Sequence, residues 1–271
     1  MNKFYIEQGE LHKIDSISKH GMQAFTNALH IHEQIRLYNT VPLFLDKHLE
    51  RITKTLQTYT IAIPNNFDNE RIQRYITRLL NVNKVYKGGV CSIHIFPDTE
   101  QTSWRFALFI DALPKPEFSF NTNGWHAILN QTCMQTMPYT PSICSWHMAW
   151  QFTAQRIQNQ QHIDAVCFVN EHNQIVGSSQ GDIVLCNDTQ VQIISLFPSP
   201  LAHYIAHLLE KNSYSVSINT SIAPKQLELA DEIFIINPID GIRWVSKYNN
   251  SIYRCIQTKK MWQILVKQLM G

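Results

Sequence analysis

Arg51 is the first residue whose type and surroundings suggest chemistry. It falls in the segment 42–59, where apolar residues recur at helical spacing, namely Leu45, Leu49, Ile52 and Leu56. A guanidinium beside such a face can hold two oxygens of a phosphate through parallel hydrogen bonds. The alternative is an arginine that is solvated on the helix surface. Glu33 and Arg36, in the strand-like run before it, are expected to face water.

Cys144 and His147 form a second candidate pair. They are three residues apart and would share a helical face if a helix has begun at that point. A cysteine nucleophile also needs a lowered pKa and an oxyanion site, and the sequence shows neither. We therefore expect Cys144 to be a small buried thiol. A different enzyme could recruit His147, Tyr139 or Ser178, but no sequence pattern favours it.

The histidines do not suggest a metal site. His203 and His207 are one helical turn apart, but the run HYIAH lacks the glutamate of the H-E-x-x-H motif and no third ligand is evident. His30 and His32 alternate in a predicted strand and are expected at the surface. The prediction is that the protein holds no metal.

Strands and helices alternate along the chain and must position these residues. The first half predicts strands within residues 1–40, a helix over 42–59 capped by Asp46, a helix over 69–80, and strands over 90–97 and 104–113. The second half predicts strands over 124–130, 164–170, 174–177, 182–186, 191–197, 213–220, 232–237 and 242–247, with helices ending near 161, over 200–211 and 224–230, and from about 258. Two prolines in the segment 113–122 suggest a boundary between domains, which we place at 117/118.

Composition excludes several classes of protein. Of 271 residues, 44% are apolar and 16% are charged, and the net charge is +2, so neither nucleic acid nor a membrane is an expected partner. The six cysteines include no C-x-x-C pair, which indicates reduced thiols. The first residues lack the apolar core of a secretory signal. We expect a cytoplasmic protein.

Three segments carry a resemblance to a known family. Residues 33–36 and 44–51 are similar to E-x-I-R … H-L-x-R-L, residues 144–182 run helix, strand, turn, strand and loop, and residues 230–245 are close to D-E-x-F-x-T-N-S-x-x-G-I-x-P-V. Together they resemble the class IV aminotransferases, the fold-type IV enzymes that use pyridoxal phosphate. The resemblance implies a two-domain α/β (α+β) protein like D-amino acid aminotransferase. Asn237, Gly241 and Ile242 favour the 4-amino-4-deoxychorismate lyase branch.

The resemblance also implies which residues surround the cofactor: Arg51, Gly177, Ser178, Leu201 and Asn237. Arg51 matches the arginine that holds the cofactor phosphate. Cys144 falls where the family has its Schiff-base lysine, and Gly177 falls where it has the glutamate beside the pyridine nitrogen. The phosphate-binding helix start G-[IV]-T-R reads Ser199-Pro200-Leu201-Ala202 here, so an apolar side chain replaces the threonine hydroxyl.

The activity implied by the family is elimination of pyruvate from aminodeoxychorismate to give 4-aminobenzoate for folate synthesis, or transamination. No lysine lies between Lys115 and Lys211, so we expect this pyridoxal phosphate chemistry to be impaired or lost. Pyridoxal phosphate is implied by resemblance only, without covalent attachment, and the protein could equally hold no cofactor. A homodimer is implied. The alternative is a non-catalytic homodimer that binds a small anion or acts as a scaffold.

Overall fold

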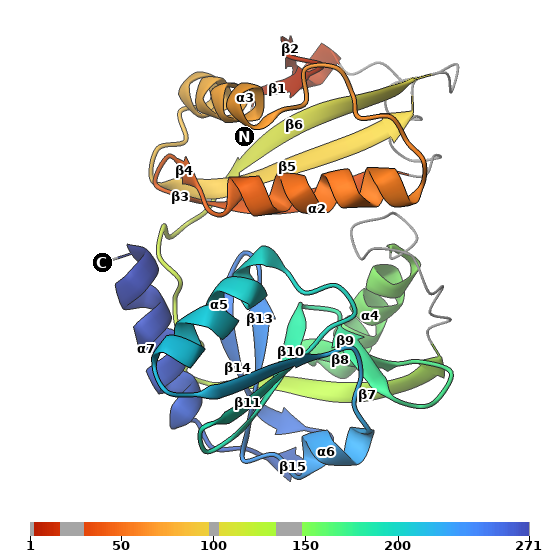
Figure 1. Cartoon of the computed structure of the whole chain (residues 1–271), viewed down its shortest axis with the longest axis vertical. Coiled ribbons are helices and arrows are strands. Elements are labelled where there is room, and N and C mark those ends of the chain that lie inside the picture. Colours follow the sequence, from red (N-terminus) through yellow and green to blue (C-terminus); the bar gives the residue numbers. More distant parts are fainter. Residues whose placement is uncertain (1–2, 17–29, 98–102, 134–147, 271) are drawn as a thin grey trace. The chain divides into compact units, whose positions relative to one another are not determined.

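The computed structural model describes residues 3–16, 30–97, 103–133 and 148–270. The chain divides into two compact units, and the division after the first large one falls between Pro116 and Glu117. Each unit contains a β-sheet with helices packed on it (Figure 1), which confirms the predicted α/β class. None of the described helices is long and apolar enough to cross a membrane.

The first unit is built on a six-stranded antiparallel sheet of order β2-β1-β6-β5-β3-β4. Its strands are β1 (Phe4–Glu7), β2 (Glu10–Lys13), β3 (Ile31–Tyr38), β4 (Val41–Pro42), β5 (Gly88–Pro97) and β6 (Trp104–Ala112), with a short 3-10 helix, η1 (Ile14–Ser16), after β2. Two helices pack on this sheet, α2 (Leu45–Thr58) and α3 (Asn69–Asn83). Fully buried side chains from both helices and the strands, such as Ile35, Ile52 and Ile76, form the core between them.

The predicted start of α2 was wrong. The residue before the helix is Phe44, which has a left-handed backbone with φ 55° and makes no side-chain cap, so Asp46 lies inside the first turn instead of capping it. Asp46 still places a negative charge near the positive end of the helix. In α3 the expected chemistry is present, since the side chain of Asp68 accepts a hydrogen bond from the backbone N–H of Arg71.

The second unit contains a sheet of order β12-β11-β10-β13-β14-β7-β8-β9, with β15 paired to β14. Its strands are β7 (Trp125–Cys133), β8 (Ala165–Val169), β9 (Ile175–Ser178), β10 (Asp182–Asn187), β11 (Gln190–Ile194), β12 (Ser215–Asn219), β13 (Glu232–Asn237), β14 (Gly241–Tyr248) and β15 (Ser251–Ile252). β8 and β9 pair antiparallel, as predicted from the turn at 171–173. The central strand β13 is buried from Glu232 to Ile236.

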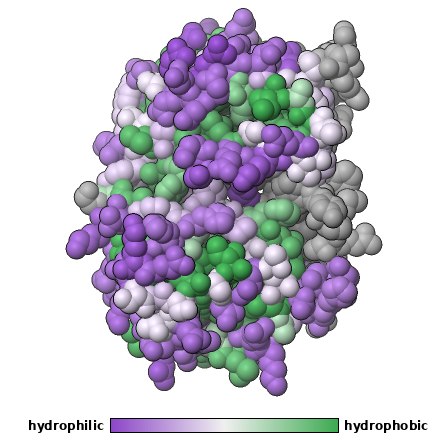
Figure 2. All heavy atoms as spheres, viewed as in Figure 1, coloured by the Kyte–Doolittle hydropathy of each residue, from purple (hydrophilic) through white to green (hydrophobic). Residues whose placement is uncertain are grey.

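Four described helices accompany this sheet: α4 (Met148–Gln161), α5 (Pro200–Lys211), α6 (Pro224–Glu228) and α7 (Gln257–Met270). Both α5 and α7 contact β13, and they contact each other, so they lie side by side on the sheet. α4 contacts β8. The surface in view is largely hydrophilic with scattered apolar residues (Figure 2), and the most exposed large apolar side chains include Phe152, Leu229 and Ile252.

Glu232, at the start of β13, closes the N-terminus of α7. Its Oε1 accepts hydrogen bonds from the backbone N–H groups of Ile256 and Gln257, each at 2.8 Å. Its Oε2 accepts from the backbone N–H and the hydroxyl of Thr258, also at 2.8 Å. The residue is only 3% exposed. Its carboxylate is tolerated there because four donors and the positive end of a helix surround it.

Glu232→Gln should therefore lower the free energy of unfolding by about 3 kcal/mol, because an amide removes the charge and turns an N–H₂ group toward N–H donors. Urea denaturation followed by circular dichroism measures this loss. Glu228→Gln, at an exposed position on α6, is the matched control and should change stability by less than about 0.5 kcal/mol. Equal effects of the two substitutions would contradict the capping role.

Candidate functional site

The loop between β9 and β10 contains two of the predicted cofactor-binding residues, Gly177 and Ser178. The hydroxyl of Ser178 donates to the carbonyl of Gly181 at 2.8 Å and accepts from the backbone N–H of Gln180 at 3.3 Å. Gly181 has φ +142°, and a Cβ at this position would overlap the carbonyl oxygen of Ile236. The loop thus needs glycine at 181 and uses the Ser178 hydroxyl to hold its own turn.

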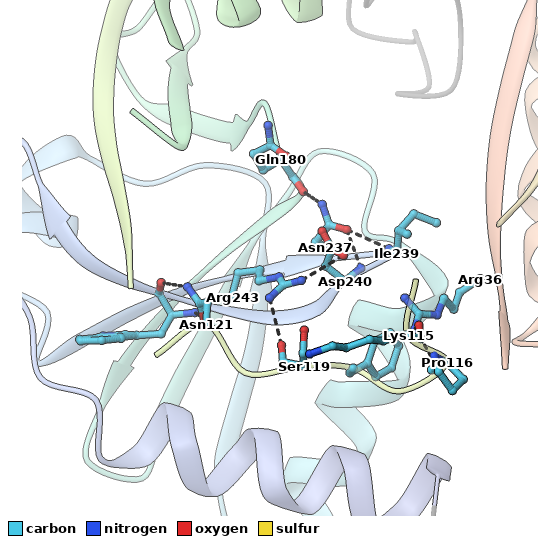
Figure 3. A network of polar contacts seen from close by, with 12 residues as sticks. Arg36, Lys115, Pro116, Ser119, Asn121, Gln180, Asn237, Ile239, Asp240 and Arg243 are labelled. Atoms are coloured by element: carbon cyan, nitrogen blue, oxygen red, sulfur yellow. Dashed lines mark hydrogen bonds and ion pairs between the residues drawn. The ribbon is translucent and has the colours of Figure 1, made fainter. Parts of the chain in front are cut away.

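Asn237 ties this loop to the turn between β13 and β14. Its Nδ2 donates to the carbonyl of Gln180 at 2.7 Å, and its Oδ1 accepts from the backbone N–H groups of Ile239 at 2.9 Å and Asp240 at 2.8 Å (Figure 3). Arg243 supports the same turn through an ion pair with Asp240 at 3.0 Å. The Asn237 amide is thereby engaged in holding two turns together.

Gly177 differs from Gly181, because nothing in its surroundings requires glycine. A Cβ built on Gly177 meets no heavy atom within 4 Å, and its φ lies outside the left-handed region. It pairs with Phe168 across β8 and β9. The position is therefore open to a larger side chain, and none of the chain's own carboxylates is supplied from it.

The start of α5 is occupied by a buried carboxylate. Oδ2 of Asp182 accepts a hydrogen bond from the Ser199 hydroxyl at 2.6 Å and from the Ser199 backbone N–H at 3.2 Å. The same hydroxyl caps α5 by accepting from the backbone N–H of Ala202 at 3.1 Å. Asp182 is 5% exposed and Ser199 is 3% exposed. Leu201, predicted to lie at the cofactor, is a buried apolar residue in the first turn.

In the first unit, the expectation that Glu33 and Arg36 face water was wrong. Glu33 alternates with Ile31 and Ile35 on the face of β3 that packs in the core, and only 4% of it is exposed. Arg36 is also 4% exposed, because its Nη2 donates to the carbonyls of Lys115 at 3.1 Å and Pro116 at 2.6 Å (Figure 3). Arg36 therefore fixes the end of the first unit's chain to its sheet.

Glu33 pairs with two residues of α2. Its Oε1 lies 2.6 Å from Nδ1 of His48 and 3.4 Å from Nη1 of Arg51. Burial by itself would raise the pKa of Glu33, but the positive charge of Arg51 and the hydrogen bond to His48 outweigh it, so the pKa is lowered. The side chain of Arg51 is 19% exposed. One edge of the guanidinium predicted to bind phosphate is thus turned to an internal carboxylate.

Cys144, His147 and Tyr139 lie outside the described residues, so their predicted roles stay predictions. Among the cysteines that the structure describes, burial raises the pKa of the Cys91, Cys167 and Cys186 thiols to about 12. Acidic neighbours add to the rise at Cys186. These thiols are protonated at neutral pH and do not act as nucleophiles.

The histidines lie partly where the sequence did not place them. His203 and His207 are exposed on α5, but His30 is 8% exposed, so the expectation that it lies at the surface was wrong. His32 stacks on His94 with ring centroids 4.4 Å apart, and burial together with the neighbouring His32 lowers the pKa of His94 to about 3. No group of three or more metal-ligating side chains occurs within the described ranges.

Two arrangements were missed by the sequence reasoning, the Glu33–His48 pair and the Asp182–Ser199 pair. The second had a local signal, because serine followed by proline is typical of a helix N-cap and first turn. Neither pairing could be read from spacing, since the partners are 15 and 17 residues apart and meet only through the fold.

Comparisons with known proteins place this geometry in context. The family model described as Amino-transferase class IV matches residues 30–248. The structure is similar to branched-chain amino acid aminotransferases from T.th., in a structure with pyridoxamine 5'-phosphate (13% identity, TM-score 0.85, 98% of this chain and 94% of that chain), and from Thermoproteus uzoniensis (13%, 0.84, 98% and 96%). The Escherichia coli enzyme is also similar (14%, 0.81, 97% and 93%). No curated protein sequence matches the chain. These likenesses confirm the predicted fold-type IV architecture.

The described residues of the second unit do not fit pyridoxal phosphate. A phosphate at the start of α5 would meet the buried Asp182 carboxylate, which already accepts the Ser199 donors. Pro200 has no N–H to offer, and Leu201 has no hydroxyl. Gly177 leaves the pyridine nitrogen without the carboxylate that makes the ring an electron sink.

The two glycines of the β9–β10 region allow a paired test. Gly181→Ala should lower the free energy of unfolding by about 2 to 4 kcal/mol, because the new methyl group overlaps a backbone oxygen and the φ is strained. Gly177→Ala should change it by no more than about 0.5 kcal/mol. Thermal and urea unfolding of both variants measures the difference, and a tolerated Gly181→Ala would show that the loop does not need glycine.

Glu33→Gln should cost about 3 kcal/mol of stability, because it leaves His48 and Arg51 beside a neutral amide. The pKa of Glu33 is lowered in the folded state, so its contribution is present above the unfolded value of about 4.3 and is lost as pH falls through the folded pKa. Stability of the wild type should thus fall more steeply below about pH 4.3 than stability of the variant.

Urea unfolding between about pH 3 and pH 7 measures this slope. The control is Glu50→Gln on the exposed side of α2, where Lys47 and Lys54 are the partners. It should leave the unfolding midpoint at pH 7 nearly unchanged. Parallel pH profiles for wild type and Glu33→Gln would disprove the linkage.

Proposed function

The chain belongs to the class IV aminotransferase family, and on this premise we propose that it is a member of the 4-amino-4-deoxychorismate lyase-like branch that has lost pyridoxal phosphate catalysis. Elimination of pyruvate and transamination both require a carbanion that the cofactor ring stabilises, together with a lysine that forms a Schiff base and then moves protons. The proposal therefore depends on what the chain offers in place of that lysine.

One observation carries the proposal: every lysine that the structure describes is exposed. The sequence has none from residue 116 to residue 210, and the lysines beyond that point lie on the outside of their elements, at 211, 225, 247, 259, 260 and 267. A Schiff-base lysine acts as a base because a desolvated pocket or a neighbouring cation tunes its amine. A solvated surface lysine lacks that environment.

The assignment to the lyase-like branch is supported by the turn between β13 and β14. Here the chain runs Asn237-Pro238-Ile239-Asp240-Gly241, and Asn237 pairs with Gly241 across the turn. The branched-chain aminotransferases similar in structure are 13–14% identical to this chain, so they support the fold and not a particular substrate. The local motif therefore supports a lyase-like origin, in keeping with folate synthesis as the ancestral role.

A non-catalytic homodimeric scaffold is the second candidate. It is favoured by large apolar side chains that reach solvent in the second unit, with Ile252 83% exposed, Phe152 72% and Leu229 71%. Burying such side chains against another protein removes apolar surface from water. Light scattering of the purified chain distinguishes a dimer from a monomer.

Incubation with pyridoxal 5'-phosphate followed by borohydride reduction tests the loss of catalysis. We expect no absorbance band at about 410 nm, no single modified lysine by mass analysis, and no pyruvate release from aminodeoxychorismate. Sparse labelling spread over exposed lysines, equal in native and urea-unfolded protein, is the background control. A stoichiometric adduct on one lysine, or turnover of aminodeoxychorismate, would overturn the proposal.

A further inference from the structure

The start of α5 already contains a negative charge. The Asp182 carboxylate, at the first residue of β10, accepts both the backbone N–H and the hydroxyl of Ser199, the residue that caps the helix. Since both residues are buried, the charge is not exchanged with ions from solvent. The positive end of the α5 dipole faces an anion that belongs to the chain itself.

The donors at this helix start are also committed. The N–H of Ser199 points to Asp182, Pro200 has no N–H, and the N–H of Ala202 points to the Ser199 hydroxyl. These are the groups that would otherwise bind an anionic ligand at a helix N-terminus. The resemblance assigns the cofactor phosphate to the start of this same helix.

We infer that Asp182 replaces an anionic ligand at the start of α5 and thereby excludes phosphate-bearing ligands from the second unit. A phosphate would need the Ser199 donors that Asp182 holds, and it would be repelled by a buried carboxylate in a region of low effective dielectric. The inference deepens the proposed function and rests on it in one respect, that the helix start no longer serves a cofactor.

Binding of pyridoxamine 5'-phosphate and of pyridoxamine, compared by isothermal titration calorimetry, tests this inference. The two probes differ by the phosphate alone. The full-length wild type should bind them with affinities within about twofold of each other. Asp182→Asn keeps an oxygen that accepts from Ser199 but removes the charge, so it should bind the phosphate form at least about tenfold more tightly than the wild type does.

Glu232→Gln is the matched control, because it removes one buried negative charge from the start of a different helix, α7. It should gain no preference for the phosphate form. If Asp182→Asn does not fold, as judged by circular dichroism, Asp182→Ser is measured in the same way. The wild-type comparison does not depend on either variant.

Two results would overturn the inference: a wild type that prefers pyridoxamine 5'-phosphate by about tenfold or more, or folded Asp182 variants that gain no preference for it. Pyridoxamine 5'-phosphate has an amine in place of the aldehyde and cannot form a Schiff base with a lysine. Phosphate binding by the wild type would therefore refute the role of Asp182 without restoring catalysis, whereas a lysine adduct with pyridoxal 5'-phosphate would refute the proposed function.

Discussion

The second unit depends on how its two long C-terminal helices satisfy their N-termini. The first N–H groups of any helix lack partners within it and concentrate positive charge. Here a strand carboxylate meets each of these starts, Asp182 of β10 at α5 and Glu232 of β13 at α7. β10 and β13 are neighbours, and the register places the two acids at opposite ends of the pair. Sheet and helices are thus joined by charge as well as by apolar packing.

The first unit follows the same rule with the signs reversed. Glu33 is a carboxylate in an otherwise apolar core, and His48 and Arg51 from α2 surround it. A buried carboxylate without such partners would take up a proton or destabilise the fold. As a result, Arg51 contributes to holding α2 on the sheet whether or not a ligand is present. In each unit, a group that the resemblance assigns to phosphate binding has an internal partner.

Sequence patterns predicted elements well where one signal dominated. The helix over 200–211 and the strand over 232–237 have the predicted bounds, because Ser-Pro begins the one and an apolar run defines the other. Asp46 was misplaced because α2 begins directly after a left-handed Phe44. The burial of Glu33 was missed because alternation shows which residues share a strand face, but not which face is covered or what polar partner lies across it.

Residues that recur in the family motifs can be retained for reasons of folding alone. Asn237 holds two turns through three hydrogen bonds, and Gly181 is required by the closeness of Ile236, so both serve the fold without any cofactor. Gly177, four residues from Gly181, has neither constraint. The needs of the fold and the needs of the cofactor thus fall on different residues of one loop. Loss of catalytic groups at 144 and 177 therefore leaves the architecture, and its likeness to active enzymes, intact.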